Sequence, residues 1–405
     1  EITQNPLEIF PEIAERLDEP AANLSGGQQQ MLGLAMALHS KPKVLLIDEL
    51  SLGLAPAVIE RILPVIKQIA DQGTAIIIVE QSVNLALTIA DRAYFMEKGQ
   101  IRFNGSTKDL LNRPDLLRSV FLSNTSISAV QTSSKPSTTE SKTILEIEDV
   151  TRSFGGILAV SSVTFDVRSN EIIGIMGPNG AGKTTLFDLL SGFVPLQGGS
   201  IKLLGQDIAT KSPAERSKLG LGRSFQDARL FPSLTVAETI AVGLERFTSA
   251  KNPISGALHL PHVSRSEKEI RKQVSDLIEL MGLGAYENKF ISELSTGTRR
   301  MVDLACVIAH KPAVVLLDEP SSGIAQKEAE QLSPVLKRIR NEMNAALVVI
   351  EHDIALLADL SDQFVALNQG TVIARGEPDK VLANPTVVSS YLGSSKETIQ
   401  RSGTL

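Results

Sequence analysis

The run Gly177-Pro178-Asn179-Gly180-Ala181-Gly182-Lys183-Thr184 decides the fold of this 405-residue chain. It has the form G-x-x-x-x-G-K-T, follows the apolar run 171–176 and leads into a stretch with helical character at 184–190. In such a strand–loop–helix context, glycine amides turn toward phosphate oxygens and the lysine brings positive charge to the β- and γ-phosphates. The run therefore predicts an α/β nucleotide-binding fold, in which the Thr184 hydroxyl ligates Mg²⁺.

Two parts of the chain repeat each other at an offset of 270 residues, which slips by one toward the end. The matching pairs are 24–28 with 294–298, Asp48-Glu49 with Asp318-Glu319, and 79–81 with 350–352. Ser25 precedes Asp48 by 23 residues, and Ser295 precedes Asp318 by the same 23. This shared register predicts two copies of one domain, because unrelated segments would not keep it.

The phosphate-loop run, in contrast, occurs once. Lys183 lies 112 residues before Ser295, and the same spacing would put a first-copy lysine about 88 residues before Glu1. We therefore expect residues 1–122 to be the C-terminal half of a first copy that continues upstream, and residues 144–393 to be a complete second copy. Between them, more than half of residues 123–143 are Ser or Thr, which predicts a flexible linker, and the polar tail 394–405 is expected to be disordered.

Bulk properties narrow the classes of function. The formal net charge is −6, which offers no basic surface for nucleic acid. The single cysteine, Cys306, excludes a disulfide framework and fits a reducing compartment. The apolar runs have the length of buried strands and are too short to span a bilayer. Any role at a membrane would therefore depend on a partner or on upstream sequence.

Apolar periodicity and turn residues predict the other elements of the fold. In the second copy, strands are expected at 144–150, 162–167, 171–176, 314–317 and 346–350, helices at 184–190, 267–280 and 295–309, and a hairpin at 363–367 and 371–375. In the first copy, strands are expected at 44–47 and 75–79, and a hairpin at 93–96 and 100–103. The β-branched runs are typical of a parallel sheet covered on both faces.

Several further side chains are candidates for chemistry. Asp318 ends an apolar strand and is expected to hold Mg²⁺, while its neighbour Glu319 would polarise an attacking water. Gln226 could contact Mg²⁺ or that water, although a solvated loop glutamine is equally consistent with the sequence. Phe154 could stack on adenine or belong to the core, and His352 could contact the γ-phosphate or be structural. Ser25, Gly26 and Gly27 open a helix and predict a second cradle for phosphate.

These motifs together resemble the ABC ATPases over nearly all of the chain outside the linker and tail. Finer detail resembles the two ATPase subunits of branched-chain (hydrophobic) amino acid importers, here fused in one polypeptide. Segments 24–32, 50–56 and 79–81 resemble one subunit, and segments 154–156, 223–231, 376–378 and 391–393 resemble the other. The resemblance implies a P-loop NTPase fold with a parallel core sheet, an antiparallel β subdomain and a helical subdomain.

The resemblance also implies a mechanism. Two ATPase halves would pair head-to-tail within the chain and enclose ATP and Mg²⁺ at composite sites. One such site would join Phe154, the 177–184 loop, Thr185 at the α-phosphate, Gln226, Asp318, Glu319 and His352 with Ser25, Gly26, Gly27 and Gln28. Closure would drive two integral membrane permeases, supplied indirectly by a periplasmic or extracellular substrate-binding protein. The chain would lie peripherally at the cytoplasmic face of the membrane.

The other composite site departs from the family pattern. Its signature has Thr296 in place of a glycine and Thr298 in place of a glutamine, Gln81 stands at the histidine position, and Leu50 replaces a proline. We therefore expect an asymmetric pair in which this second site is slow or inactive, so that Glu319→Gln abolishes turnover and Glu49→Gln spares most of it. Two other functions stay open: an importer of urea or short amides, and a soluble twin-cassette protein acting on ribosomes or DNA.

Overall fold

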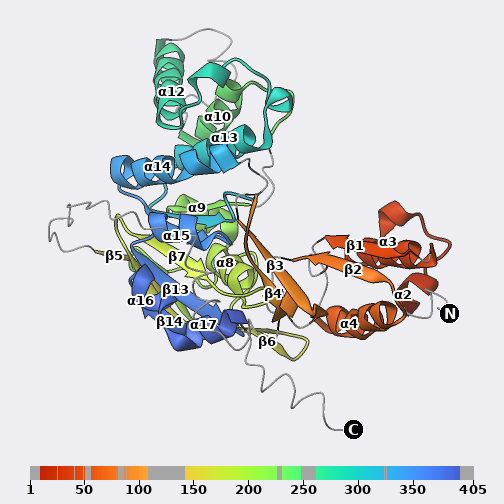
Figure 1. Cartoon of the computed structure of the whole chain (residues 1–405). Coiled ribbons are helices and arrows are strands. Elements are labelled where there is room, and N and C mark those ends of the chain that lie inside the picture. The colour runs from red at the N-terminus through yellow and green to blue at the C-terminus, as the bar shows by residue number, and fades with distance from the viewer. Residues whose placement is uncertain are drawn as a thin grey trace. The chain divides into compact units, whose positions relative to one another are not determined.

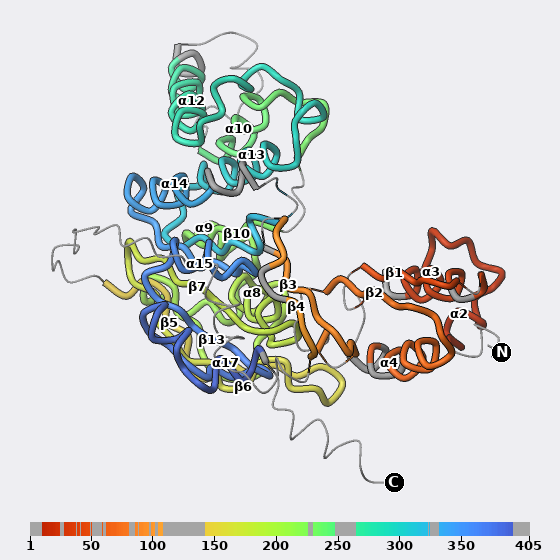
Figure 2. Tube along the Cα trace, in the orientation of Figure 1, coloured from red at the N-terminus to blue at the C-terminus, as the bar shows by residue number. Residues whose placement is uncertain are grey.

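The computed structural model describes residues 10–107, apart from 25, 41, 49, 51–55, 81–85, 88 and 98, and residues 142–392, apart from 226–229, 248–260, 323 and 325. Its contacts divide the chain into two compact units, Glu1–Phe121 with Tyr391–Leu405, and Leu122–Ser390. Both units are coloured by residue number in Figures 1 and 2. The expected linker 123–143, except its last two residues, and the expected tail 394–405 lie outside the described residues.

The second unit is built on a six-stranded sheet with the strand order β10-β11-β12-β7-β13-β14. Its strands are β7 (Ile172–Met176), β10 (Leu221–Ser224), β11 (Val314–Asp318), β12 (Ala346–Ile350), β13 (Gln363–Asn368) and β14 (Thr371–Gly376). The pairings are parallel except for that of β13 with β14. Every residue of β7, β11 and β12 is buried, as expected for a parallel sheet covered on both faces.

A separate antiparallel sheet precedes and follows the phosphate loop in the chain, with the order β6-β5-β8-β9. Its strands are β5 (Thr143–Phe154), β6 (Ile157–Arg168), β8 (Gly198–Leu203) and β9 (Gln206–Asp207). Ile147 and Phe165 from this sheet share one core with Ile175 of β7 and with Leu186 and Phe187 of helix α8 (Lys183–Ser191). The same apolar core therefore fixes the loop between β7 and α8.

Helices cover the sheet and form a region of their own. They are α9 (Pro213–Lys218), α10 (Val236–Leu244), α12 (Pro261–Leu280), α13 (Thr296–Ala309), α14 (Gln326–Met343), α15 (Ile354–Leu360), α16 (Pro378–Leu382) and α17 (Pro385–Leu392). Short 3₁₀ turns occur at Glu245–Phe247, Gly284–Tyr286 and Ile291–Glu293. Helices α10, α12 and α13 pack together, as Figure 1 shows at its top. Across the described ranges, no helix has the length and apolarity needed to cross a bilayer.

The first unit contains a smaller set of elements. They are α2 (Pro11–Ala14), a 3₁₀ turn at Ala21–Asn23, α3 (Gly26–His39), β1 (Val44–Asp48), α4 (Pro56–Asp71), β2 (Ala75–Val79), β3 (Arg92–Glu97) and β4 (Gln100–Ser106). Strands β1 and β2 pair in parallel with Val44 opposite Ala75, and β11 and β12 pair in parallel with Val314 opposite Ala346. The repeat in the sequence is thus matched by an identical strand register.

The two strand pairs differ in how they are covered. In the first unit, Leu46, Ile77 and Val79 are 71%, 56% and 59% exposed. Their counterparts Leu316, Val348 and Ile350 are fully buried in the core that also contains α8. The opposite face of β1, which carries the buried Leu45, packs with residues of α3 and α4. One face of the β1–β2 pair is therefore apolar and open to solvent.

Candidate functional site

The phosphate-binding loop connects the buried strand β7 to helix α8, as its sequence predicts. Lys183, the first residue of α8, is only 7% exposed, and its ammonium group donates to the carbonyl oxygens of Gly177 at 2.7 Å and Pro178 at 3.2 Å. Burial lowers the pKa of Lys183 to about 8, against the opposing charges of Glu319 and Asp318. The lysine is thus held over its own loop, in the field of two carboxylates.

Gly182 shows why the loop needs glycine. Its backbone is left-handed, with φ at +97°, and a Cβ atom there would lie 2.3 Å from the carbonyl oxygen of Ala159 on β6. The amide of Gly370, in the turn between β13 and β14, donates to the carbonyl oxygen of Ala181 at 3.0 Å. The loop is therefore clamped from two sides, and its amides are held in place at the start of α8.

Asp318 ends β11 and is 4% exposed. Its Oδ2 lies 3.6 Å from a terminal nitrogen of Arg223, whereas its Oδ1 is buried and has no hydrogen-bond partner among the described residues. Burial raises the pKa of Asp318, and the positive charge of Arg223 opposes that shift. A buried carboxylate oxygen without a protein partner suits a Mg²⁺ ion, which binds through carboxylates, hydroxyls and water.

Glu319 has a strained backbone and a well-defined partner. Its φ is +48°, which is uncommon for a residue other than glycine, and its amide donates to the carbonyl oxygen of Ile350 at 2.9 Å. Its Oε1 lies 2.8 Å from Nε2 of His352, which follows β12. The ends of two neighbouring parallel strands therefore place a carboxylate and an imidazole in contact, a pairing that the sequence analysis did not predict.

Glu351 stabilises the site by hydrogen bonds, and the sequence analysis did not identify it as a site residue. It is 5% exposed, and its carboxylate accepts from the Ser321 amide at 2.7 Å, the Ser321 hydroxyl at 2.8 Å and the His352 amide at 3.2 Å. It thereby joins the segments that follow β11 and β12. The repeat in the sequence contained a signal for this pair, because Ser51 and Glu80 occupy the matching positions earlier in the chain.

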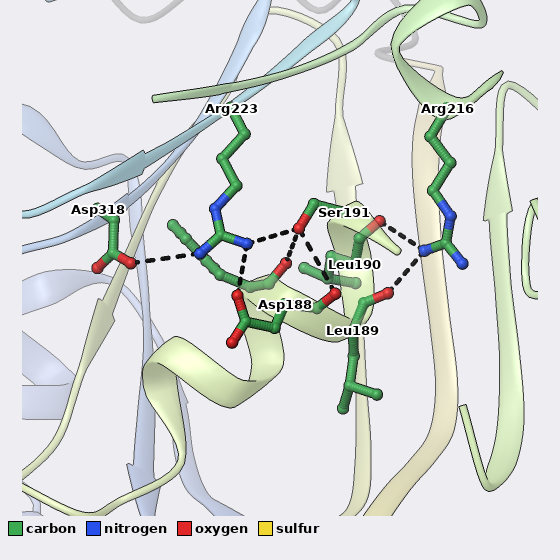
Figure 3. A network of polar contacts seen from close by, with 8 residues as sticks. Asp188, Leu189, Leu190, Ser191, Arg216, Arg223 and Asp318 are labelled. Atoms are coloured by element: carbon green, nitrogen blue, oxygen red, sulfur yellow. Dashed lines mark hydrogen bonds and ion pairs between the residues drawn. The ribbon is translucent and has the colours of Figure 1, made fainter. Parts of the chain in front are cut away.

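Two arginines fix the C-terminal end of α8, and Figure 3 shows them on either side of Ser191. Arg216 donates to the carbonyl oxygens of Leu189 at 2.6 Å and Leu190 at 2.8 Å. Arg223 contacts both Asp188 and Ser191 of α8 and reaches toward Asp318. Arg223 thus connects the helix that begins at Lys183 with the strand that ends at Asp318.

The segment 294–298, which the sequence analysis singled out, leads into α13. The hydroxyl of Ser295 accepts from the amide of Thr298 at 3.2 Å and lies 2.9 Å from the Thr298 hydroxyl. Thr298 is buried, whereas Thr296 is exposed at the first residue of the helix. The serine therefore caps its own helix, and a threonine hydroxyl engages it.

The other candidate residues are placed to different degrees. Thr184 is exposed and Thr185 is half-buried in the first turn of α8. Phe154 is the last residue of β5 and is 44% exposed. The guanidinium group of Arg152 lies over its ring, 4.7 Å from the ring centre. Gly26, Gly27 and Gln28 lie in the first turn of α3, and Leu50 is buried next to β1. The candidates outside the described residues are Ser25, Glu49, Gln81 and Gln226.

The described residues of this site could bind polyphosphate and a divalent cation and could orient a water molecule. A helix N-terminus and a buried lysine attract polyphosphate. A buried carboxylate with a free oxygen suits a divalent cation, and a carboxylate hydrogen-bonded to imidazole can orient and polarise water. All of these groups lie at the carboxyl ends of parallel strands or in the loop that follows β7, which is where α/β sheets bind ligands.

Comparisons with known proteins agree with this geometry. Residues 160–322 match the family model described as ABC transporter, and residues 12–85 match a model described as AAA domain, putative AbiEii toxin, Type IV TA system. The high-affinity branched-chain amino acid transport ATP-binding protein BraF of Pseudomonas aeruginosa is 35% identical over 253 residues, which cover 62% of this chain and 99% of BraF. LivG of Escherichia coli K12, with the same description, is 34% identical over 253 residues, which cover 62% of this chain and 99% of LivG.

Two solved structures share the fold. The ADP conformation of an ATP-binding cassette of an ABC transporter superposes with a TM-score of 0.53 at 25% identity, covering 62% of this chain and 100% of that one. A Clostridium perfringens protein described as part of an ABC transporter complex superposes with a TM-score of 0.52 at 26% identity, covering 64% of this chain and 94% of that one. The similarity thus comprises both sequence and cassette architecture.

Proposed function

The chain belongs to the ATP-binding proteins of ABC transporters, and from that membership we propose that it energises the import of branched-chain or other hydrophobic amino acids through partner permeases. Its chemical activity is ATP hydrolysis. The observation that supports ATP hydrolysis as the source of energy is the position of Lys183, Asp318 and the Glu319–His352 pair beside a phosphate loop.

In the proposed mechanism, catalysis is positioning and electrostatics more than covalent chemistry. The loop amides and Lys183 hold the β- and γ-phosphates. Mg²⁺, held by Thr184, Asp318 and Gln226, would supply positive charge to the phosphate oxygens. Glu319 orients and polarises the attacking water, and His352 keeps the Glu319 carboxylate in place while contacting the γ-phosphate.

We further propose that ATP is enclosed by both copies of the domain. Phe154 would stack on adenine, Thr185 would hold the α-phosphate, and Ser25, Gly26, Gly27 and Gln28 would close over the phosphates from the first copy. The second composite site would be slow or inactive. The contact between the hydroxyls of Ser295 and Thr298 supports that asymmetry, because it engages a serine that would otherwise face phosphate.

The substrate proposal depends on the relatives. BraF and LivG are described as branched-chain amino acid transport proteins, and both are aligned over almost their whole length. By analogy, this chain would associate with two integral membrane permeases at the cytoplasmic face of the membrane and depend indirectly on a substrate-binding protein. An ATPase of this kind does not touch the transported molecule, so the substrate must be tested directly.

Uptake of labelled leucine and labelled urea tests the proposal in cells that carry the gene as wild type or as Lys183→Ala. We expect the variant to lose leucine uptake and to keep urea uptake. Loss of urea uptake alone would replace the amino acid assignment with the amide one. No change in either would overturn the import proposal.

A further inference from the structure

We propose that Asp188 and Ser191 of α8 are positioning residues that hold Arg223 back from Asp318, so that one oxygen of Asp318 stays free for the metal ion. The proposal rests on the role of Asp318 proposed above. It concerns Asp188 and Ser191, which the sequence motifs do not include, and Arg223, the first residue of segment 223–231, and Figure 3 shows the three as one network.

Arg223 is shared unequally between two carboxylates. One terminal nitrogen lies 2.7 Å from Oδ1 of Asp188 and 2.6 Å from the hydroxyl of Ser191. The other terminal nitrogen lies 3.6 Å from Oδ2 of Asp318, which is beyond hydrogen-bond distance. The guanidinium is therefore anchored on α8 and makes only a longer charge contact with the end of β11.

The surroundings of Arg223 leave it little freedom. Its side chain is 8% exposed, and its guanidinium centre lies 4.8 Å from the ring centre of Phe225 and 5.6 Å from that of Phe193. Its backbone is fixed on β10, opposite Leu316 of β11. A buried cation beside two carboxylates will shift toward whichever of them holds it more strongly.

Because Asp188 and Ser191 hold Arg223, one oxygen of Asp318 stays free of the guanidinium group. The Oδ1 atom of Asp318 is buried and has no hydrogen-bond partner among the described residues. A guanidinium released from α8 could approach Asp318 and bind both of its oxygens, because arginine and carboxylate form bidentate pairs. The metal would then compete with a cation of the protein for the same carboxylate.

The first test measures metal dependence by binding, without turnover. The full chain is titrated with a fluorescent ATP analogue at increasing Mg²⁺, and the Mg²⁺ concentration that gives half of the gain in nucleotide affinity is recorded. We expect Asp188→Asn to raise this concentration about ten-fold, the lower end of the scale on which partners of metal ligands act. For Ser191→Ala we expect a smaller rise of about three-fold, because it removes one neutral contact of Arg223. Ser191→Ala is informative because it changes no charge. Equal values for wild type and both variants would overturn the proposal.

A double-mutant cycle shows whether the effect passes through Arg223. In an Arg223→Gln background, we expect Asp188→Asn to change the half-saturating Mg²⁺ less than about two-fold. A ten-fold effect that persists without Arg223 would mean that Asp188 acts by its own charge, which contradicts the proposal. If Arg223→Gln does not fold, as thermal unfolding would show, the Ser191→Ala result decides.

A matched pair of controls exists elsewhere in the same unit. Asp359 accepts from the hydroxyl of Ser333 and pairs with Lys337 at 2.9 Å, so it also combines an aspartate, a serine and a basic side chain. Asp359→Asn and Ser333→Ala should leave the Mg²⁺ dependence unchanged. Asp318→Asn should abolish the Mg²⁺ dependence; if it does not, the proposed metal role of Asp318 has failed. If it does and the α8 variants have no effect, only the present inference has failed.

Discussion

Glu319 has the properties of a residue kept for chemistry at a cost in stability. Its left-handed backbone is strained, and its carboxylate is fixed 2.8 Å from His352. We expect Glu319→Gln to lower the rate of phosphate release from ATP by at least about 100-fold, because it removes a general base, while nucleotide affinity stays near that of wild type. Glu377→Gln, at an exposed pair with Lys380, is the control. Turnover near the wild-type rate would remove Glu319 from its proposed role.

Arg216 is expected to contribute to stability alone. It is 1% exposed and donates to four carbonyl oxygens, those of Leu189, Leu190, Ala209 and Lys211. Arg216→Met removes all four of these hydrogen bonds and should destabilise the fold by about 3 kcal/mol, measured by thermal unfolding.

The control for Arg216 is Arg338→Met, which breaks only an exposed pair with Glu342 and should cost less than about 0.5 kcal/mol. If both variants unfolded at the same temperature, the carbonyl contacts of Arg216 would have no net value.

Asp303 predicts a dependence of stability on pH. Burial raises its pKa to about 6, although Arg300 opposes the shift. Between about pH 4 and pH 6 the folded chain keeps a proton that the unfolded chain releases, so the contribution of this group falls as pH rises through that window. The uncharged Asp303→Asn escapes this loss. Its unfolding midpoint relative to wild type should be about 3 °C higher at about pH 7.5 than at about pH 4.5. A constant difference would contradict the prediction.

Site residues that belong to a sequence motif could be predicted from the sequence. Site residues whose contacts depend on how distant segments pack could not. Lys183, Asp318, Glu319 and His352 follow strands or loops whose type the sequence indicates, whereas the contact between Glu319 and His352 depends on which strands are neighbours in the sheet. Arg223 and Asp188 are 35 residues apart, and their contact depends on how β10 passes the end of α8. Spacing alone contains no such information.

At the scale of elements, the phosphate loop offers a matched pair of substitutions. A Cβ at Gly182 would lie 2.3 Å from the backbone oxygen of Ala159, whereas a Cβ at Gly180 would meet no atom within 4 Å. Both glycines are left-handed, so Gly180→Ala should cost only about 1 kcal/mol of backbone strain. Gly182→Ala should cost about 3 kcal/mol or more, since backbone must move. Thermal unfolding without nucleotide measures both, and equal losses would contradict the expected clamp on β6.

The elements that could be predicted closely are the buried ones. The expected strands 314–317 and 346–350 are found as β11 and β12 within one residue, because unbroken β-branched runs of that length favour buried parallel strands. The expected strands 144–150 and 162–167 are parts of longer strands, β5 and β6. Their pairing contains several irregularities of register, which break the apolar alternation from which strand length is read.

At the scale of the whole molecule, one pattern is used twice in different surroundings. The pairs β1–β2 and β11–β12 have the same register, yet the face that carries Leu316 is buried against a phosphate-loop helix, and the face that carries Leu46 is exposed. The sequence repeat could predict the shared strands, whereas their pairing and register came from the structure. The repeat could not predict burial, because burial depends on which neighbours cover each face.

That difference predicts that residues 1–122 and residues 144–393 differ in their ability to fold alone. Residues 1–122 expressed alone present Leu46, Ile77 and Val79 on an open sheet face, and a two-stranded pair has little stability of its own. We expect this segment to bind an apolar dye and to lose structure gradually on heating. Residues 144–393, whose matching face is buried with α8, should melt cooperatively and bind little dye. Replacing Leu46 and Ile77 with Thr should lower dye binding by the first segment without making its melt cooperative. A cooperative melt of residues 1–122 without dye binding would show that this half folds without a cover on that face.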